Sequence, residues 1–144
     1  MLYVSLKGLT VLQALKENLS YLKTYNQTLI NELTELCLEN DKLQEKITQI
    51  QNKINTRNKI KSNFEEVLGK DSRSFTFLDN LSKLGLNNQL RYIEDSLVKN
   101  SELIEINYEE RFHTGDQLAK VHREIRILSL PENKHLADTI IEED

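Results

Sequence analysis

The residues that could do chemistry are three histidines, one cysteine and several adjacent carboxylates. A metal site needs ligands at spacings such as His-x-x-x-His or Cys-x-x-Cys, and His113, His122 and His135 do not have such spacings. Cys37 has no histidine near it in the sequence, so nothing nearby favours its ionised, nucleophilic form. We therefore expect no metal site and no cysteine nucleophile.

Two further motifs lack the context that their chemistry requires. Gly69-Lys70-Asp71-Ser72 has the Gly-Lys pair of a phosphate-binding loop, but neither the earlier glycine nor a preceding strand. Glu65-Glu66 and Glu109-Glu110 are neighbours along a helical stretch, where adjacent side chains do not face each other. The sequence thus predicts a non-enzymatic protein with no catalytic residue and no cofactor.

The strongest pattern is a ladder of leucine, isoleucine and asparagine from Leu12 to Leu68, with no proline inside it. Apolar residues alternate at spacings of three and four, as in a coiled coil. This heptad pattern needs a second helix to cover it. The predicted coiled-coil interface consists of Leu15, Leu19, Leu22, Asn26, Leu29, Leu33, Leu36, Asn40, Leu43, Ile47, Ile50 and Ile54.

The two asparagines in this interface bear on how the helices pair. Asn26 and Asn40 both occupy a positions, where a buried amide specifies register and strand number in parallel dimers. We predict a parallel, in-register pair on this basis. The alternative is that asparagine, which is abundant throughout the chain, falls in these positions by chance.

The e and g positions, which flank the predicted interface, do not identify the partner. Most of the charge pairs that select a homodimer are missing from the e and g positions. Tyr25, Ile30 and Cys37 widen the apolar stripe, as expected when a further helix packs alongside. Protein partners bound through the coil are therefore expected, either as a homodimer or as a heteromeric bundle.

The organisation changes after the ladder. Gly69 is expected to end the long helix, and residues 69–74 read as a linker between a coiled-coil segment, 1–68, and a C-terminal helical module, 75–144. Ser72, in the linker, is expected to cap the first short helix of the module, which stops at Gly85. A second helix is expected to end near Asn100. The predicted fold class is all-α, a long parallel coiled-coil helix followed by a small module of short helices.

The rest of the module also reads as helical. For residues 101–113 we favour helix over strand. Thr114 and Gln117 resemble a capping box for the next helix, and Pro131 is expected in the first turn of a last helix that extends to Ile141. The residues predicted to pack inside the module are Leu118, Val121, Ile125 and Leu128.

Charge and hydropathy restrict the partners and the cellular compartment that we expect. The formal net charge is −4, which argues against general nucleic-acid binding, and the basic residues from Lys53 to Arg73 are expected to form a solvated helix face. No apolar run reaches the length of a membrane span, so we expect no membrane insertion. A single cysteine allows no internal disulfide, which favours the cytoplasm, with the nucleus as the alternative.

One resemblance to a known family extends this interpretation. It is carried by Thr28-Leu29, Leu36, Glu39-Asn40, Leu43, Ile50-Gln51-Asn52-Lys53-Ile54, Phe64 and Phe77-Leu78-Asp79-Asn80-Leu81-Ser82-Lys83-Leu84. These residues resemble the N-terminal region of the third subunit of the conserved oligomeric Golgi tethering complex. The resemblance implies vesicle tethering, binding of sister subunits through the coil and a peripheral location on Golgi membranes.

The function expected from these observations is that of a scaffold. We predict a coiled-coil assembly subunit of a eukaryotic multi-protein complex, of which the Golgi tethering complex is one version. The alternatives are a kinetochore or spindle-type coiled-coil subunit and a homodimeric protein-binding adaptor. A nucleic-acid binder that uses the basic stretch is a further, less favoured reading.

Overall fold

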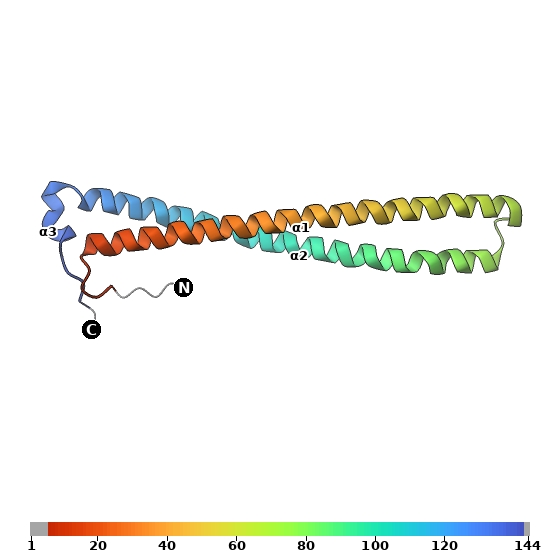
Figure 1. Ribbon diagram of the computed structural model, residues 1–144, viewed down its shortest axis with the longest axis horizontal. Coiled ribbons are helices and arrows are strands. Elements are labelled where there is room, and N and C mark those ends of the chain that lie inside the picture. Colours follow the sequence, from red (N-terminus) through yellow and green to blue (C-terminus); the bar gives the residue numbers. More distant parts are fainter. Residues whose placement is uncertain (1–5, 143–144) are drawn as a thin grey trace. The chain divides into compact units, whose positions relative to one another are not determined.

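The computed structural model describes residues 6–142, and these residues form two long helices and two short ones. Helix α1 spans Val11–Leu68 and α2 spans Arg73–Leu128, followed by the 3-10 helix η1, Pro131–Asn133, and by α3, Lys134–Ala137 (Figure 1). The all-α prediction is confirmed. Residues 1–5 of the predicted coiled-coil segment lie outside the described residues.

Helix α1 begins at a capping box. The backbone N–H of Gln13 donates to the hydroxyl of Thr10 at 3.1 Å, and the backbone N–H of Thr10 donates to the side-chain oxygen of Gln13 at 2.9 Å. The helix ends where Gly69 takes a φ of +84°, with its N–H bonded to the carbonyl of Glu65 at 2.9 Å. The prediction that Gly69 ends the long helix is confirmed.

Helix α2 is continuous, so the prediction of several short helices is wrong. Ser72 caps it, as expected, by accepting a bond of 3.4 Å from the N–H of Phe75. Gly85 and Asn100, the predicted stops, both lie inside the helix. A glycine costs a helix only about 1 kcal/mol relative to alanine, and the buried residues Leu86 and Ile93 provide more than that through packing.

Two other expectations for α2 have definite outcomes. Residues 101–113 are helical, so the preference for helix over strand is confirmed. The predicted capping box at Thr114 is wrong, because the hydroxyl of Thr114 donates to the carbonyl of Glu110, one turn earlier, at 2.8 Å. Such a bond is typical of threonine in a helix interior.

The chain divides into two compact units. Unit 1 comprises Met1–Thr34 and Glu105–Asp144, and unit 2 comprises Glu35–Ile104. In each unit, a segment of α1 and a segment of α2 run side by side in opposite directions (Figure 1). Bonds between Asn40 and Asn100 in unit 2, and between Leu29 and Asn107 in unit 1, join the two helices.

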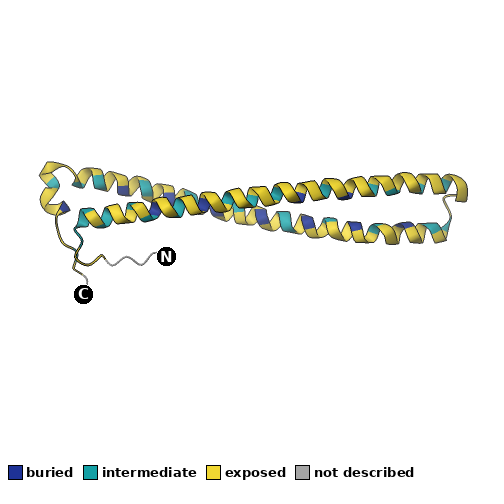
Figure 2. Ribbon diagram, in the orientation of Figure 1, coloured by how far each residue is buried: buried dark blue, intermediate teal, exposed yellow. Residues whose placement is uncertain are grey.

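Buried residues follow one face of each helix (Figure 2). We call this face the seam. On α1 the buried side chains fall in the predicted heptad, and in unit 2 Leu43 and Ile50 pack with Leu86 and Ile93 of α2. On α2 the fully buried positions recur every seven residues, at Leu86, Ile93, Asn100, Asn107, Thr114 and Val121. Helix α2 therefore carries a heptad of its own, with polar residues in it.

The ends of the described chain meet within unit 1. Helix α3 ends at Ala137, so the prediction that the last helix extends to Ile141 is wrong. Residues after it are extended and pair with the segment before α1, through bonds from Gly8 N–H to the Ile141 carbonyl and from Val11 N–H to the Thr139 carbonyl. Thr10 and Ile140 form an isolated antiparallel bridge. These backbone bonds replace a further helical turn.

Candidate protein-binding surface

The face of α1 that we expected to bind another chain is covered by α2 of the same chain. Leu22, Leu29, Leu43 and Ile50 are buried. The other predicted interface residues are half-buried: Leu15, Leu19, Asn26, Leu33, Leu36, Asn40, Ile47 and Ile54. Because α2 runs antiparallel to α1 in each unit, the prediction of a parallel pair through this face is wrong. A short loop joins the two helices and makes the pairing intramolecular.

Asn40 has a partner of a different kind from the one expected. We predicted an asparagine pair across the axis of a parallel dimer, but the amide of Asn100 donates to the side-chain oxygen of Asn40 at 2.9 Å within unit 2. Asn100 is buried at 6% exposure. A buried amide must be paired to avoid a large desolvation cost, so this bond fixes which residues face each other.

Unit 1 contains a second polar position in its seam. The amide of Asn107 donates to the backbone carbonyl of Leu29 at 2.8 Å, and its oxygen accepts a bond of 2.9 Å from Nε of Arg111. One turn away the Tyr25 hydroxyl donates to the carboxylate of Glu110 at 3.1 Å. That hydrogen bond, together with partial desolvation, raises the pKa of Tyr25.

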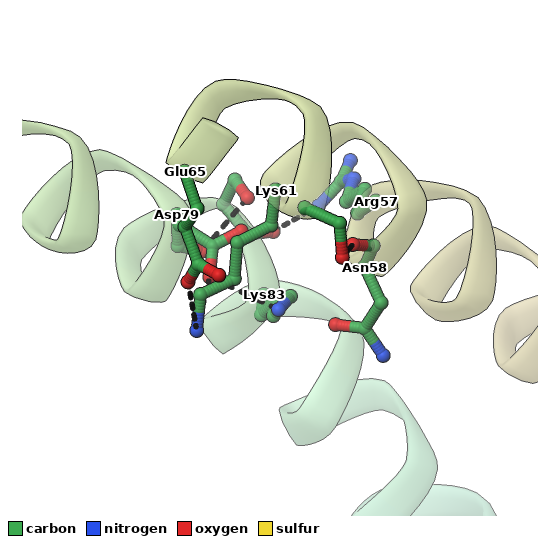
Figure 3. Close-up of polar contacts among 8 residues, drawn as sticks. Arg57, Asn58, Lys61, Glu65, Asp79 and Lys83 are labelled. Carbon is green, nitrogen blue, oxygen red and sulfur yellow. Dashed lines mark hydrogen bonds and ion pairs between the residues drawn. The ribbon is translucent and has the colours of Figure 1, made fainter. Parts of the chain in front are cut away.

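In unit 2 the seam near the interhelix loop carries charges (Figure 3). The carboxylate of Asp79 is buried and forms ion pairs of 3.0 Å with Lys83 and 3.8 Å with Lys61. The guanidinium of Arg57 donates to the backbone carbonyl of Ser82. We call Lys61, Asp79 and Lys83 the charged layer. Two residues of the basic stretch from 53 to 73, Arg57 and Lys61, thus bond to residues of α2.

The residues predicted to pack against a further helix are mostly exposed. Tyr25 is half-buried beside Glu110, Ile30 is 38% exposed, and Cys37 is exposed. The residues predicted to pack in the C-terminal module lie in α2, where Val121 is buried and Leu118, Ile125 and Leu128 are half-buried in unit 1.

Around the charged layer and towards the interhelix loop, large apolar side chains are exposed on both helices of unit 2. We call them the tip patch. On α1, Phe64 is 45% exposed and stacks on Phe75 with ring centroids 4.7 Å apart. On α2, Phe77 and Leu81 are 66% and 57% exposed. The tip patch comprises Phe64, Val67, Leu68, Phe77, Leu78, Leu81 and Leu84.

The tip patch is the feature that sequence reasoning missed. The sequence shows Phe64, Leu78, Leu81 and Leu84 as apolar residues, but it does not show which side of each helix stays exposed. In the structure, the seam of α2 passes through Asp79, Lys83 and Leu86, so Leu81 and Leu84 point elsewhere. The signal that could have revealed this is the heptad that contains Leu86, Ile93 and Val121, extended back to Asp79.

Other kinds of site find no support in the described residues. Among residues 6–142, no group of three or more histidine, cysteine, aspartate or glutamate side chains could hold a metal ion. None of the helices in this range combines the length and apolar character that crossing a membrane requires. The candidate functional site is the exposed apolar surface of the tip patch.

Comparisons with protein families, curated proteins and solved structures found no match to this chain. The resemblance to the Golgi tethering subunit stays a prediction.

Proposed function

We propose that this chain is a non-enzymatic assembly subunit of a multi-protein complex, and that its tip patch binds a helix of another protein chain. The observation that carries the proposal is the apolar face near the start of α2. Phe77, Leu81 and Leu84 are spaced by four and three residues, so they line one side of the helix. Each remains more than half exposed.

The spacing of these residues supports a helical partner. Apolar residues at intervals of three and four form a stripe that fits the ridges of another helix. The seam of α2 lies on a different face, around Asp79 and Leu86, so α2 could bind a partner without separating from α1 in unit 2. The proposed complex would then contain three or more helices at this point.

The number of large apolar side chains left exposed in this part of unit 2 also supports binding. Exposed apolar side chains that gather on one part of a soluble protein often mark an interaction site. Here four large apolar side chains of α2 and three of α1 are exposed within unit 2. A Golgi tethering complex, as the sequence resemblance implies, and a kinetochore or spindle complex are the settings we propose for this subunit.

The proposal is tested by photo-crosslinking in cells that express the chain. A photoreactive phenylalanine analogue at Leu81 is expected to crosslink to another protein, which mass spectrometry identifies. The same analogue at Asn31, an exposed position of α1 in unit 1, is the control. A product of twice the chain mass would instead identify a second copy as the occupant.

Charge variants complete the test. Leu81→Glu with Leu84→Glu should abolish binding of the crosslinked partner, because burial of two carboxylates is unfavourable. Thr28→Glu with Asn31→Glu adds the same charge at the same spacing on exposed positions of unit 1 and should leave binding unchanged. If Leu81 forms no crosslink, or if both double variants bind equally, the tip patch does not bind a partner.

A further inference from the structure

Unit 2 has a groove between its two helices, which we call the lysine groove. Its volume is about 490 Å³. Three buried core residues, Leu43, Ile50 and Ile93, form its floor. The remaining lining residues form its rim: Lys46, Gln49, Lys53, Asn88, Gln89 and Tyr92. Tyr92 is 74% exposed, so much of its ring is available to a partner.

The charged residues that line the groove are all positive. Lys46 and Lys53 line it, and no carboxylate does. In the part of the chain that the structure describes, neither lysine forms an ion pair. An apolar floor bordered by unpaired cations is complementary to a partner that has an apolar centre and acidic edges.

The positive charge extends along one flank of the seam. Lys46 and Lys53 occupy successive g positions of α1, so they lie on the same side of the helix. Lys42 precedes Lys46 by four residues, and Lys99 follows Tyr92 by seven, so these two exposed lysines lie on the same flank. Cations therefore border the groove on both helices.

The groove continues along α1 toward the tip patch. A second cavity, of about 360 Å³, shares Lys53 with the first and is lined by Asn52, Lys53, Thr56, Arg57 and Ile60. Ile60 is 46% exposed and lies four residues before Phe64 and seven before Val67, on the same side of the helix. The two cavities together can therefore hold several turns of another helix.

We propose that the lysine groove binds an acidic amphipathic helix of a partner protein. Apolar side chains of that helix cover the groove floor, and its carboxylates pair with Lys46 and Lys53. Residues seven apart in a helix are separated by a rise of about 10.5 Å, so carboxylates one heptad apart on the partner match the two lysines. The proposal goes beyond the proposed function, because it concerns residues outside the tip patch.

A protein helix fits the groove better than other anionic partners do. A membrane surface is flat and does not reach a floor that lies between two helices. A nucleic acid would leave that apolar floor without an apolar partner, and the net charge of −4 on the chain repels its phosphates.

The test uses the full chain and a labelled synthetic helix about three heptads long, with leucine at its a and d positions and glutamate at its e and g positions. Repulsion between glutamates keeps this peptide from pairing with itself, so its apolar face is available. Fluorescence anisotropy measures its binding to the chain. A version with lysine in place of every glutamate should bind at least about tenfold more weakly.

Variants of the chain locate the contact. Lys46→Gln with Lys53→Gln should weaken binding of the glutamate peptide about fivefold, because two rim ion pairs are lost. Gln44→Glu with Gln51→Glu changes the net charge by the same amount at exposed e positions, on the other flank of α1, and should leave binding unchanged. Lys46→Glu with Lys53→Glu should reverse the preference, so that the lysine peptide binds more tightly.

Several outcomes would overturn the proposal. These are no binding of the glutamate peptide at roughly millimolar concentration, equal binding of both peptides, and equal binding by the two variants that differ in flank. Tighter binding of double-stranded DNA or of phosphatidylserine vesicles would assign the groove to another class of anion. A loss of peptide binding only in Leu81→Glu with Leu84→Glu would place the peptide on the tip patch instead. Failure at Lys46 and Lys53 leaves the proposed function, which is tested at Leu81, unaffected.

Discussion

The side-chain amide of Asn100 donates a hydrogen bond of 2.9 Å to the side-chain oxygen of Asn40, inside the seam of unit 2. Replacing Asn100 alone with leucine leaves the amide of Asn40 without its partner, which should cost about 1–2 kcal/mol in unfolding free energy. Replacing both with leucine should recover that loss, because apolar side chains then fill the position. Urea unfolding measures the unfolding free energy of the single and the double variant. Equal losses of unfolding free energy in both variants would show that the bond between Asn100 and Asn40 does not contribute to stability.

The apolar cluster of unit 2 should dominate its stability. Ile93→Ala removes a side chain that is only 6% exposed, and should cost about 2–5 kcal/mol. Leu38→Ala, at a position that is 56% exposed, should change the unfolding free energy by less than about 0.5 kcal/mol. Thermal and urea unfolding can compare the two. Similar effects would mean that Ile93 is not in the core.

The charged layer should be sensitive to the loss of its anion. Asp79→Ala leaves Lys83 without its carboxylate and Lys61 with Glu65 alone, 3.8 Å away, and should destabilise the chain by about 1–3 kcal/mol. Changing all three residues to leucine should restore much of that stability, since apolar side chains can fill the same layer. If the triple variant is less stable than Asp79→Ala, the layer contributes stability through its ion pairs.

Two glycines should respond in opposite directions to alanine. Gly69 has a φ of +84°, where alanine is strained, so Gly69→Ala should destabilise by about 1 kcal/mol. Gly115 lies inside α2 with open space around its Cα, so Gly115→Ala should stabilise by about 0.5–1 kcal/mol. Thermal unfolding is sufficient to distinguish the two. A loss of stability in Gly115→Ala would contradict a continuous α2.

Tyr25 should titrate at a higher pH than the ordinary value for a tyrosine side chain. Its hydroxyl donates to the Glu110 carboxylate, which stabilises the protonated phenol and raises its pKa. The stability from this bond is present below the ordinary tyrosine pKa and is lost as the pH rises through the raised pKa. Carbon-13 NMR of the tyrosine rings measures this directly. Glu110→Ala should return the Tyr25 pKa toward its ordinary value, and an unchanged titration would exclude the bond.

The sequence was informative about α1. Its heptad positions recur at spacings of three and four and most of them are apolar, so the face that includes Leu22, Leu29 and Leu43 could be identified from the sequence alone. The direction in which the two helices pair could not be identified from the sequence. Parallel and antiparallel seams use the same periodicity, and the asparagine in the seam, Asn40, is satisfied equally well by Asn100 of the same chain.

The heptad of α2 was harder to recognise. Asp79, Asn100, Asn107 and Thr114 occupy positions that a periodicity search expects to be apolar. Their burial depends on partners from α1, such as the Leu29 carbonyl for Asn107, which only the paired structure supplies. The exposed tip patch was missed for the same reason, since the residues that face outward are identified only once this heptad is recognised.

The loop between α1 and α2 has a consequence for the order of folding. Contacts between the helices join residues that are 25 positions apart at Arg57 and Ser82, 60 at Asn40 and Asn100, and 85 at Tyr25 and Glu110. The entropy lost on closing a chain segment grows with its length, so contacts near the loop can form first and shorten the segments that remain to be closed. We expect pairing to begin beside Gly69 and to spread from there, with the isolated bridge between Thr10 and Ile140 forming last.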